Sequence, residues 1–464
     1  MERTSLFERL NSWARTSITL KLFTIVFLIL ILLIPSSMIS SLIGERETLR
    51  MTSIDEVSSK WGGQQTIGGP IISVPYRTVI TDEKGKPQST ILYAHFLPES
   101  LNIEGEVIPQ ERHRGIYVVV LYGSKINVNG KFSTPDLSLL SIPKGDFILK
   151  DALVTLGISD MKGIRENIKL QLGDTIYSFN PGIATHDIFP SGVSFPIDLT
   201  TFQGATFNFK LNLNGSSKLF FLPLGKETVV NLKSPWLNPG FDGEFLPEKR
   251  MVSDKGFSAN WKVLHLNRNY GQAGIGSFIQ QTTSGAVYNP DEYSYSNTSD
   301  IYSSFGVNFL LPVDEYQKTM RSAKYGIIFI VITFLTFFFV EVLNRKRIHP
   351  IQYLLVGFAI CLFYILLISL SEHIPFNVAY LICCLIILLL ITFYSKSVLK
   401  NNFLTGLIFL VLTILYIFFY SLLQLEDYAL LLGSIGLLLV LAIIMYLTRN
   451  IDWYAINSEE QIHS

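Results

Sequence analysis

The run Tyr325-Gly-Ile-Ile-Phe-Ile-Val-Ile-Thr-Phe-Leu-Thr-Phe-Phe-Phe-Val-Glu-Val-Leu343 decides the class of this chain, because Glu341 is its only charged residue. Four similar apolar runs follow it, at Ile351–Leu370, Phe376–Tyr394, Phe403–Leu423 and Tyr428–Leu447. A helix rises about 1.5 Å per residue, so about 20 apolar residues cross a hydrocarbon core of about 30 Å. None of the runs has the alternating polar face of a soluble amphipathic helix. We therefore expect a bundle of five membrane spans over residues 325–447.

The composition supports a protein that is partly embedded in lipid. Of its 464 residues 49% are hydrophobic and only 16% are charged, whereas about 25% is usual in soluble domains. The 37 basic and 37 acidic residues cancel, and this balance gives no support to nucleic-acid binding. All three cysteines, Cys361, Cys383 and Cys384, lie in apolar runs, where we expect packing rather than redox chemistry. The long region before them holds no cysteine and therefore needs no disulfide.

A further apolar run, Leu22–Ile43, follows a polar start that carries Arg3, Arg9, Arg15 and Lys21. A cleaved signal peptide is one interpretation of this segment. However, the run is longer than the 7–15 apolar residues of a signal peptide, and no clear Ala-x-Ala cleavage site follows it. We therefore predict an uncleaved first span, which gives six spans in total.

The charges of the connecting segments predict the orientation, because lysine and arginine are retained on the cytoplasmic side. Basic segments at 345–347, 396–400 and 449 alternate with segments at 372–373 and 426–427 that hold Glu, His and Asp but no Lys or Arg. This alternation is in step with six spans. It places residues 1–21 and 448–464 in the cytoplasm and exports residues 44–324, which would lie in the periplasm.

The exported region begins and ends with helical patterns and is β-rich between them. Glu45–Trp61 has apolar residues at helical spacing, and Asp314–Lys324 also has a helical pattern, so we expect a paired stalk. Phe207, Phe209, Leu211 and Leu213 alternate with polar residues, as in a half-buried strand. Asn129-Gly130 and Asn214-Gly215 are typical of hairpin turns. These patterns predict a sandwich or a related antiparallel β fold.

A short repeat leaves open whether this region is one domain or two. Phe96-Leu-Pro-Glu99 recurs as Phe245-Leu-Pro-Glu248, which is consistent with two similar β halves.

The search for catalytic and metal-binding motifs finds none. The chain has no His-Glu-x-x-His, Cys-x-x-Cys, Gly-x-Ser-x-Gly or Gly-rich phosphate loop with Lys. His95, His113, His186 and His265 are scattered without the short spacing of metal ligands, so we expect no metal and no cofactor.

Four polar residues in or near the predicted bundle are the candidate functional residues. Glu341 lies near the inner end of the second span, where a buried carboxylate is costly and must be paired. We expect either an ion pair with Arg345 or Lys346, or a role as a proton or ion ligand. The adjacent Glu372 and His373 lie at the outer end of the third span, where they either end the helix or act as an acid–base pair. The dipeptide His349-Pro350 predicts a helix start.

The chain resembles the CreD family of bacterial inner-membrane proteins over nearly its whole length. The resemblance is carried by Arg347-Ile-His-Pro-Ile-Gln-Tyr-Leu-Leu-Val-Gly357, Leu370-Ser-Glu-His373, Leu447-Thr-Arg-Asn-Ile-Asp-Trp-Tyr454, Phe96-Leu-Pro-Glu-Ser-Leu101, Arg114-Gly-Ile-Tyr117, Gly243-Glu-Phe-Leu-Pro247, Lys249-Arg250 and Arg321-Ser-Ala-Lys-Tyr325. It implies a role in cell-envelope integrity that is linked to a two-component stress regulon and to colicin and β-lactam responses. It supplies no active-site residues that could be transferred to this chain.

The sequence thus favours a non-enzymatic protein of the bacterial inner membrane that contacts the lipid bilayer. Its exported domain would bind another envelope protein, a lipid or a cell-wall component. A transporter or membrane enzyme acting on a lipid or cell-wall precursor through Glu341, Glu372 and His373 is the alternative. A purely structural scaffold is a third hypothesis that the sequence does not separate from the first.

Overall fold

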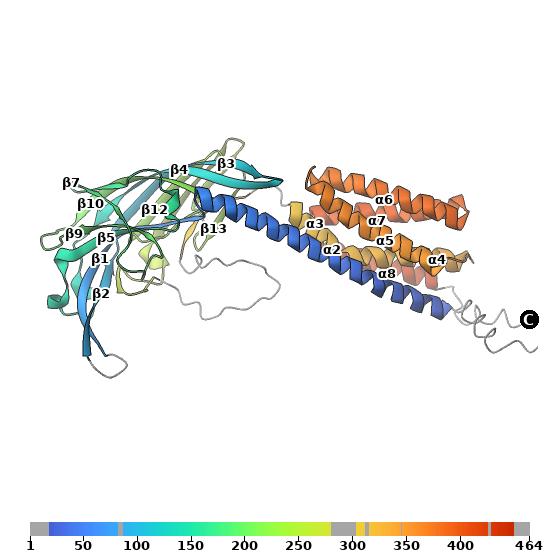
Figure 1. Cartoon of the computed structure of the whole chain (residues 1–464), viewed down its shortest axis with the longest axis horizontal. Helices are drawn as coiled ribbons and strands as arrows, with labels where there is room; N and C mark the ends of the chain where they lie inside the picture. The colour runs from blue at the N-terminus through green and yellow to red at the C-terminus, as the bar shows by residue number, and fades with distance from the viewer. Residues whose placement is uncertain are drawn as a thin grey trace, which may run out of the picture. The chain divides into compact units, whose positions relative to one another are not determined.

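The computed structural model describes residues 18–81, 87–279, 303–310, 315–344, 346–425 and 428–449 (Figure 1). They form two compact units. The first unit takes its residues from Met1–Leu49 and Val313–Ser464, and the second unit is Arg50–Pro312. The second unit thus begins inside the first long helix, Ile18–Trp61.

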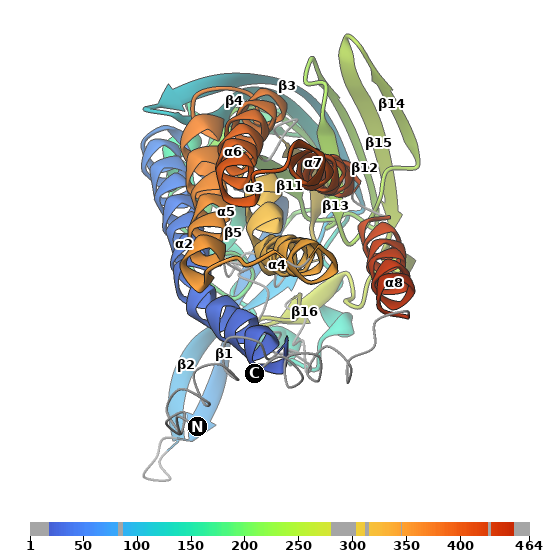
Figure 2. The ribbon, with the colours of Figure 1, turned by 90° about the vertical axis from the view of Figure 1, so that its right-hand side faces the viewer.

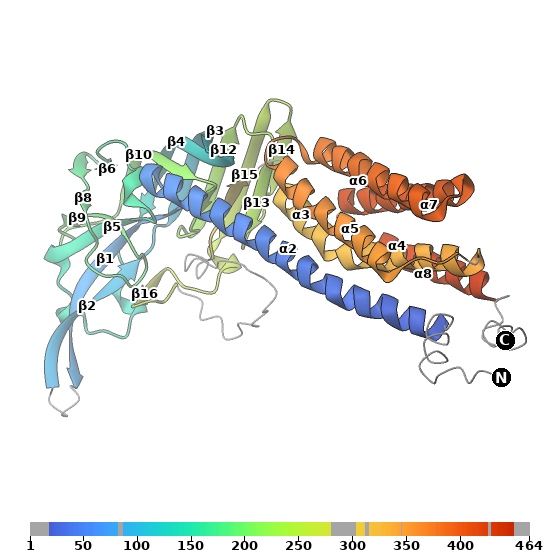
Figure 3. The same cartoon turned by 45° about the vertical axis from the view of Figure 1, so that its right-hand side comes forward.

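Six helices of the described chain are long and apolar enough to cross a membrane, which confirms the predicted number and order. They are α2 (Ile18–Trp61), α4 (Gly326–Leu343), α5 (Pro350–Ser371), α6 (Phe376–Leu399), α7 (Asn402–Gln424) and α8 (Ala429–Thr448). Helix α2 has 44 residues, because the predicted entrance helix continues the first span without a break (Figure 3). The C-terminal helices begin and end within a few residues of the predicted apolar runs.

The core of the first unit is an aromatic cluster that joins α4, α5 and α7. The Phe329 ring centroid lies 4.5 Å from that of Tyr416, 4.6 Å from that of Phe419 and 6.4 Å from that of Phe363. Gly357 of α5 leaves room for Leu32 of α2, since a Cβ there would lie 2.2 Å from a Leu32 methyl carbon. Many apolar side chains on the outer faces of the helices remain exposed, as expected of helices that face lipid.

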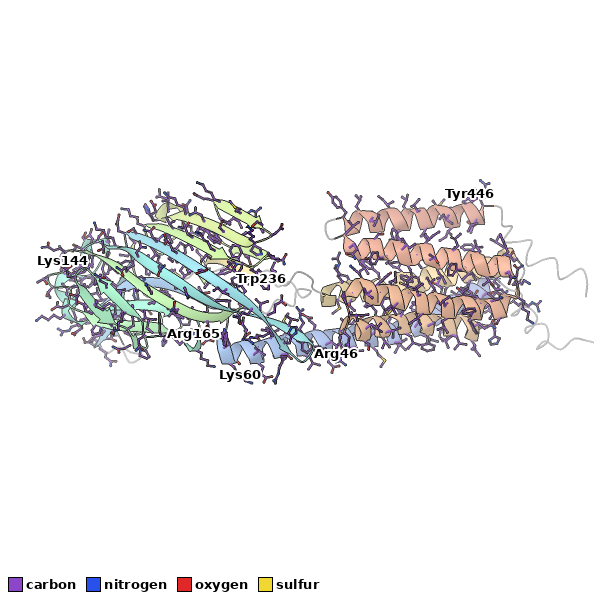
Figure 4. All side chains as sticks on the ribbon, turned by 90° about the horizontal axis from the view of Figure 1, so that it is seen from above. Arg46, Lys60, Lys144, Arg165, Trp236 and Tyr446 are labelled. Atoms are coloured by element: carbon purple, nitrogen blue, oxygen red, sulfur yellow. The ribbon has the colours of Figure 1, made fainter. Side chains whose placement is uncertain are left out.

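Helix α8 lies at the edge of the bundle (Figure 2). None of its most apolar window is buried. Tyr446 on this helix is 64% exposed (Figure 4). Its apolar surface is therefore available to lipid.

The exit helix, α3 (Glu315–Lys324), packs within the first unit against α4, α5 and α7. Its small residues Ser322 and Ala323 are buried, while Arg321 donates a hydrogen bond to the carbonyl of Leu425 at 2.8 Å. We expected α3 and the entrance helix to form a paired stalk. Residues 315–324 belong to the first unit, however, whereas residues 50–61 belong to the second. The reason is the amphipathic pattern of α3, which buries one face in the bundle.

The second unit consists of two sheets. The nine-stranded sheet has the order β13-β17-β11-β1-β5-β9-β8, with β2 paired to β1 and β16 paired to β2. Its strands are β1 (Gln65–Thr81), β2 (Pro87–Phe96), β5 (Ala152–Ile158), β8 (Asn180–Pro181), β9 (Gly192–Ile197), β11 (Lys218–Phe221), β13 (Pro239–Gly243), β16 (Ala273–Ile275) and β17 (Phe305–Phe309). The eight-stranded sheet has the order β14-β15-β12-β3-β4-β10-β6-β7. Its strands are β3 (Ser100–Arg114), β4 (Tyr117–Phe132), β6 (Lys169–Leu172), β7 (Thr175–Ser178), β10 (Ala205–Ser216), β12 (Glu227–Ser234), β14 (Lys249–Ser253) and β15 (Gly256–Leu264).

One apolar core lies between the two sheets, as the predicted sandwich requires. The predicted alternation in β10 is confirmed, because Phe207, Phe209, Leu211 and Leu213 are all buried in this core. Most pairings are antiparallel, as expected, but β1 pairs with β11 and β12 pairs with β3 in parallel.

Both Asn-Gly pairs that we predicted as turns lie inside strands. Gly130 belongs to β4 and Gly215 to β10. A Cβ on Gly130 would lie 2.1 Å from the Ser100 carbonyl oxygen, and one on Gly215 would lie 2.3 Å from the Tyr122 hydroxyl oxygen. These glycines therefore permit close approach within the fold, and the prediction of turns was wrong. Directly after β10 the chain crosses to β11 in the other sheet at Ser217, which has a φ of 57°.

The two Phe-Leu-Pro-Glu segments have the same place in the fold. Residues 96–99 lead from β2 in the nine-stranded sheet to the hairpin β3–β4 in the other sheet. Residues 245–248 lead from β13 in the nine-stranded sheet to β14 and β15 in the other sheet. The repeat thus marks a crossing between sheets within one shared core.

Candidate functional site

The carboxylate of Glu341 is the centre of a buried polar network at one end of the helix bundle. Glu341 is 3% exposed, and its Oε1 lies 3.0 Å from Nζ of Lys21 on α2. The Tyr353 hydroxyl of α5 donates a hydrogen bond to Oε2 at 2.8 Å, and the Ile348 N–H donates to Oε1 at 3.3 Å. The predicted side-chain partner was Arg345 or Lys346. Arg345 is outside the described residues, and Lys346 makes its contact through its backbone N–H to the Glu341 carbonyl.

This network can tie three helices together but leaves little capacity for other chemistry. The carboxylate has a cation and two donors around it, so its charge is compensated and its oxygens are bonded. The three side chains come from three helices, α2 (Lys21), α4 (Glu341) and α5 (Tyr353). Helix α2 is distant from the other two in the sequence, whereas α4 and α5 are consecutive. The geometry therefore favours a structural role.

A second ion pair involves the other predicted carboxylate, Glu372, which caps the C-terminus of α5. Its Oε1 lies 3.8 Å from Nε of Arg46 on α2, and the Glu372 side chain is 11% exposed. Arg46 is labelled in Figure 4. The adjacent His373 is exposed, so the structure does not enclose the two side chains in one site.

His349 caps the N-terminus of α5, as the sequence predicts. The ring Nδ1 of His349 accepts a hydrogen bond from the Ile351 N–H at 3.3 Å. The backbone N–H of His349 donates a hydrogen bond to Oε1 of Gln352 at 2.9 Å. Pro350 occupies the first helical position. This side chain therefore begins a helix.

The structure separates the candidate residues into two groups at opposite ends of the bundle. Glu341 and His349 lie near the start of α5, whereas Glu372 and His373 follow its end. Their partners Lys21 and Arg46 are 25 residues apart on α2, which corresponds to about 37 Å along a helix. That length exceeds the hydrocarbon core of about 30 Å, so the two groups correspond to the two interfaces.

The β-rich unit contains a cavity of about 610 Å³ that the sequence did not reveal. Its walls come from residues 54–59 at the end of α2, residues 63–66 at the start of β1, residues 157–160 at the end of β5, residues 189–191 before β9, and residues 216–222 around β11. Cavities of this size are typical of small-molecule sites. It is therefore the best candidate binding site among the described residues.

The wall of this cavity is held by a buried glutamine. Gln65 is fully buried, and its Nε2 donates hydrogen bonds to the carbonyls of Asp160 at 2.9 Å and Asn214 at 3.0 Å. Its Oε1 accepts from the Asp160 N–H at 3.2 Å. Asp160 in turn accepts from the Gly63 N–H at 2.8 Å. These bonds join β1, the segment after β5, and β10, so the cavity is preorganised.

The lining of the cavity combines polar and apolar side chains, and the charged side chains among its described residues are acidic. Asp55 and Asp160 line it, and no Lys, Arg or His is among the described lining residues. Ser58 also lines it and is 7% exposed, but its buried Oγ has no hydrogen-bond partner among the described residues. A buried hydroxyl without a partner is costly, which indicates a site that a ligand can complete.

Three side chains that the sequence did not connect form a Ser–His–Asp row within the β-rich unit. Ser73 Oγ lies 2.9 Å from Nδ1 of His95, and Nε2 of His95 lies 3.2 Å from Oδ2 of Asp187. Ser73 and His95 are directly paired on β1 and β2. A nucleophilic serine must be reached by substrate. Ser73 is only 2% exposed, and neither it nor His95 lines the cavity described above. The row therefore fastens the loop that carries Asp187.

Comparison with known proteins agrees with this architecture. A family model described as "Inner membrane protein CreD" matches residues 17–454. The inner membrane protein CreD of Escherichia coli (strain K12) is 34% identical over 432 residues, which cover 92% of each chain. The chain belongs to the CreD family. It is accordingly an inner-membrane protein of the cell envelope with several membrane-spanning helices, as its sequence predicts.

The first prediction concerns the Lys21–Glu341 pair. Lys21→Met should reduce the free energy of unfolding by about 3 kcal/mol, because it leaves a buried carboxylate without its cation. Adding Glu341→Gln should restore part of this loss, since a neutral amide can still accept from Tyr353 and Ile348. Thermal unfolding of the full chain in lipid nanodiscs measures both effects.

Lys60→Met is the matched control, because it removes an exposed lysine that pairs with Glu56 of the same helix. An exposed helix pair contributes about 0.5 kcal/mol. If Lys21→Met were as mild as Lys60→Met, the buried network would not be holding the bundle.

The second prediction concerns His95, whose pKa burial lowers from its usual 6.5, although Asp187 opposes this shift. The unfolded chain therefore binds the proton more readily, and the stabilisation present above pH 6.5 is lost as the pH falls below it. His95→Gln should be less stable at pH 7 but lose less stability between pH 7 and pH 5. Urea unfolding of the full chain at both pH values tests this, with exposed His113→Gln as control. Equal pH dependence in both variants would contradict the assignment.

Proposed function

We propose that this inner-membrane protein supports envelope integrity by binding an envelope component in the cavity of its β-rich unit. The orientation inferred from the basic segments exports this unit to the periplasm. The helix bundle then serves as its anchor, and no catalysis is required. The observation that carries the proposal is the preorganised cavity with the partnerless Ser58 hydroxyl.

The position of the polar residues in the bundle supports the anchor role. A transporter or membrane enzyme would need Glu341, Glu372 and His373 around one substrate. They lie at opposite ends of α5, and each carboxylate has its own cation from α2. This arrangement favours the binding role over transport or membrane catalysis.

The role under stress follows from the family resemblance and belongs to the same proposal. A cell exposed to a β-lactam or a colicin needs intact contacts between its membrane and the outer layers of its envelope. A membrane-anchored domain with a ligand cavity can maintain such a contact.

Complementation of a bacterial strain that lacks this protein tests the proposed function. Ser59 is exposed and lines the cavity, so the indole of Ser59→Trp should occupy part of it. This variant should lose protection against envelope stress at matched protein levels. Met51→Trp, at an exposed position of the same helix that does not line the cavity, should protect like the original protein.

Two further variants address the alternative. Glu372→Gln and His373→Ala should retain protection. If either abolished it while Ser59→Trp protected normally, the activity would reside in the bundle and the proposed function would be wrong.

A further inference from the structure

The chemistry of the cavity restricts the class of ligand that it can bind, and this inference rests on the proposed function. The described lining carries Asp55 and Asp160 and no basic side chain. Lys162 does not line the cavity, although its Nζ donates a hydrogen bond to the Ser59 carbonyl at 3.2 Å. Among the described lining side chains, an anionic ligand such as a phosphate or a phospholipid headgroup would meet only like charge, which is unfavourable. The cavity therefore suits a ligand without negative charge.

The polar groups of the cavity are short hydroxyl, amide and carboxylate side chains. Ser58 and Ser59 lie on α2, Gln64 precedes β1, and Ser217 lies at the corner before β11. Serine hydroxyls both donate and accept hydrogen bonds, and the Asp55 carboxylate accepts them. A ligand that offers many hydroxyl groups matches this set, because each of its hydroxyls can also donate or accept.

Among the described residues, the strands that border the cavity leave no open edge for an extended peptide. The start of β1 pairs with β11 on one side and with β5 on the other. At Gly157, β5 pairs with both β1 and β9. A peptide that binds by strand addition needs unpaired backbone groups. Recognition must therefore come from side chains, which favours a ligand other than an extended peptide.

Apolar surface at the rim complements the polar groups. Ile54 of α2 is partly exposed and Pro190 is exposed, and both line the cavity. Sugar rings combine hydroxyl groups with apolar C–H faces, so a sugar can use both kinds of surface at once. The volume of about 610 Å³ is within the range of about 300–1,000 Å³ for small-ligand sites.

We propose that the cavity binds one or two uncharged sugar residues of an envelope glycan. The hydroxyl groups of the sugar bond to Ser58, Ser59 and Asp55, and its apolar face packs on Ile54 and Pro190. The same chemistry occurs in N-acetylated glycans, such as those of the cell wall, and in plain glucans. The two sources differ in the acetamido group, and the experiment distinguishes them.

Isothermal titration calorimetry on the full chain in lipid nanodiscs tests the ligand class. Detergents with sugar headgroups must be removed, since they would compete for the cavity. The probes are N,N′-diacetylchitobiose, cellobiose, glucose 6-phosphate and trialanine. We expect binding of at least one of the two disaccharides and no binding of the phosphate or the peptide. The disaccharide that binds more tightly identifies the source.

Variants locate the bound sugar. Asp55→Asn and Ser58→Ala should each weaken binding about tenfold, as expected for the loss of one good hydrogen bond. Ser59→Trp should abolish binding, whereas Met51→Trp should leave it unchanged. A thermal unfolding curve for each variant verifies that it is folded.

Two outcomes would overturn the glycan assignment. One is binding of trialanine or glucose 6-phosphate in place of the disaccharides. The other is binding of no sugar by a folded chain. If Ser59→Trp still lost protection in cells in either case, the proposed function would stand and only the ligand class would be wrong. If Ser59→Trp protected normally, the proposed function itself would fail.

Discussion

The buried carboxylate of Glu341 sets a constraint that the rest of the membrane unit must satisfy. A charge in a lipid-facing bundle must be paired, and its partner Lys21 comes from the first span, which residues 50–312 separate from α4 in the sequence. The pair therefore brings the N-terminal helix back to the C-terminal helices. The Arg46–Glu372 pair holds the same helix at the other end, and the close Leu32–Gly357 contact lies between them.

Both units contain buried polar atoms without a hydrogen-bond partner among the described residues. In the bundle these atoms belong to Thr333, Glu372, Thr392 and Tyr416, and in the β-rich unit they belong to Ser58, Asn214 and Arg268. Of the predicted candidate residues in the bundle, Glu341 is bonded to Lys21 and Tyr353, Glu372 pairs with Arg46, and His349 caps a helix. In the β-rich unit, a glutamine-braced cavity leaves the Ser58 hydroxyl without a partner. Native proteins depart from full satisfaction mainly at functional sites. Of the residues with such atoms, Ser58 is the one that lines the cavity, and we therefore place ligand binding in the β-rich unit and anchoring in the bundle.

The sequence predicted what local patterns determine and missed what long-range packing determines. Apolar length located all six helices, and alternation located the buried face of β10. The Asn-Gly pairs were predicted as turns because glycine is favoured in turns. At Gly130 and Gly215, however, it makes room for neighbours distant in sequence. The Lys21–Glu341 pair, the His95 row and the cavity also depend on residues brought together by the fold. For the Lys21–Glu341 pair, the sequence offered one signal, namely that Lys21 is the last charged residue before an apolar run.

The most direct test of this account is whether the cavity opens to the periplasm. A single cysteine at Ser59 can be labelled specifically, because Cys361, Cys383 and Cys384 are all buried. In cells with a permeabilised outer membrane, a membrane-impermeant maleimide should label Ser59→Cys. It should label exposed Lys396→Cys, predicted to be cytoplasmic, only after the inner membrane is broken. The reverse pattern would place the β-rich unit in the cytoplasm and contradict a role in binding the outer layers of the envelope.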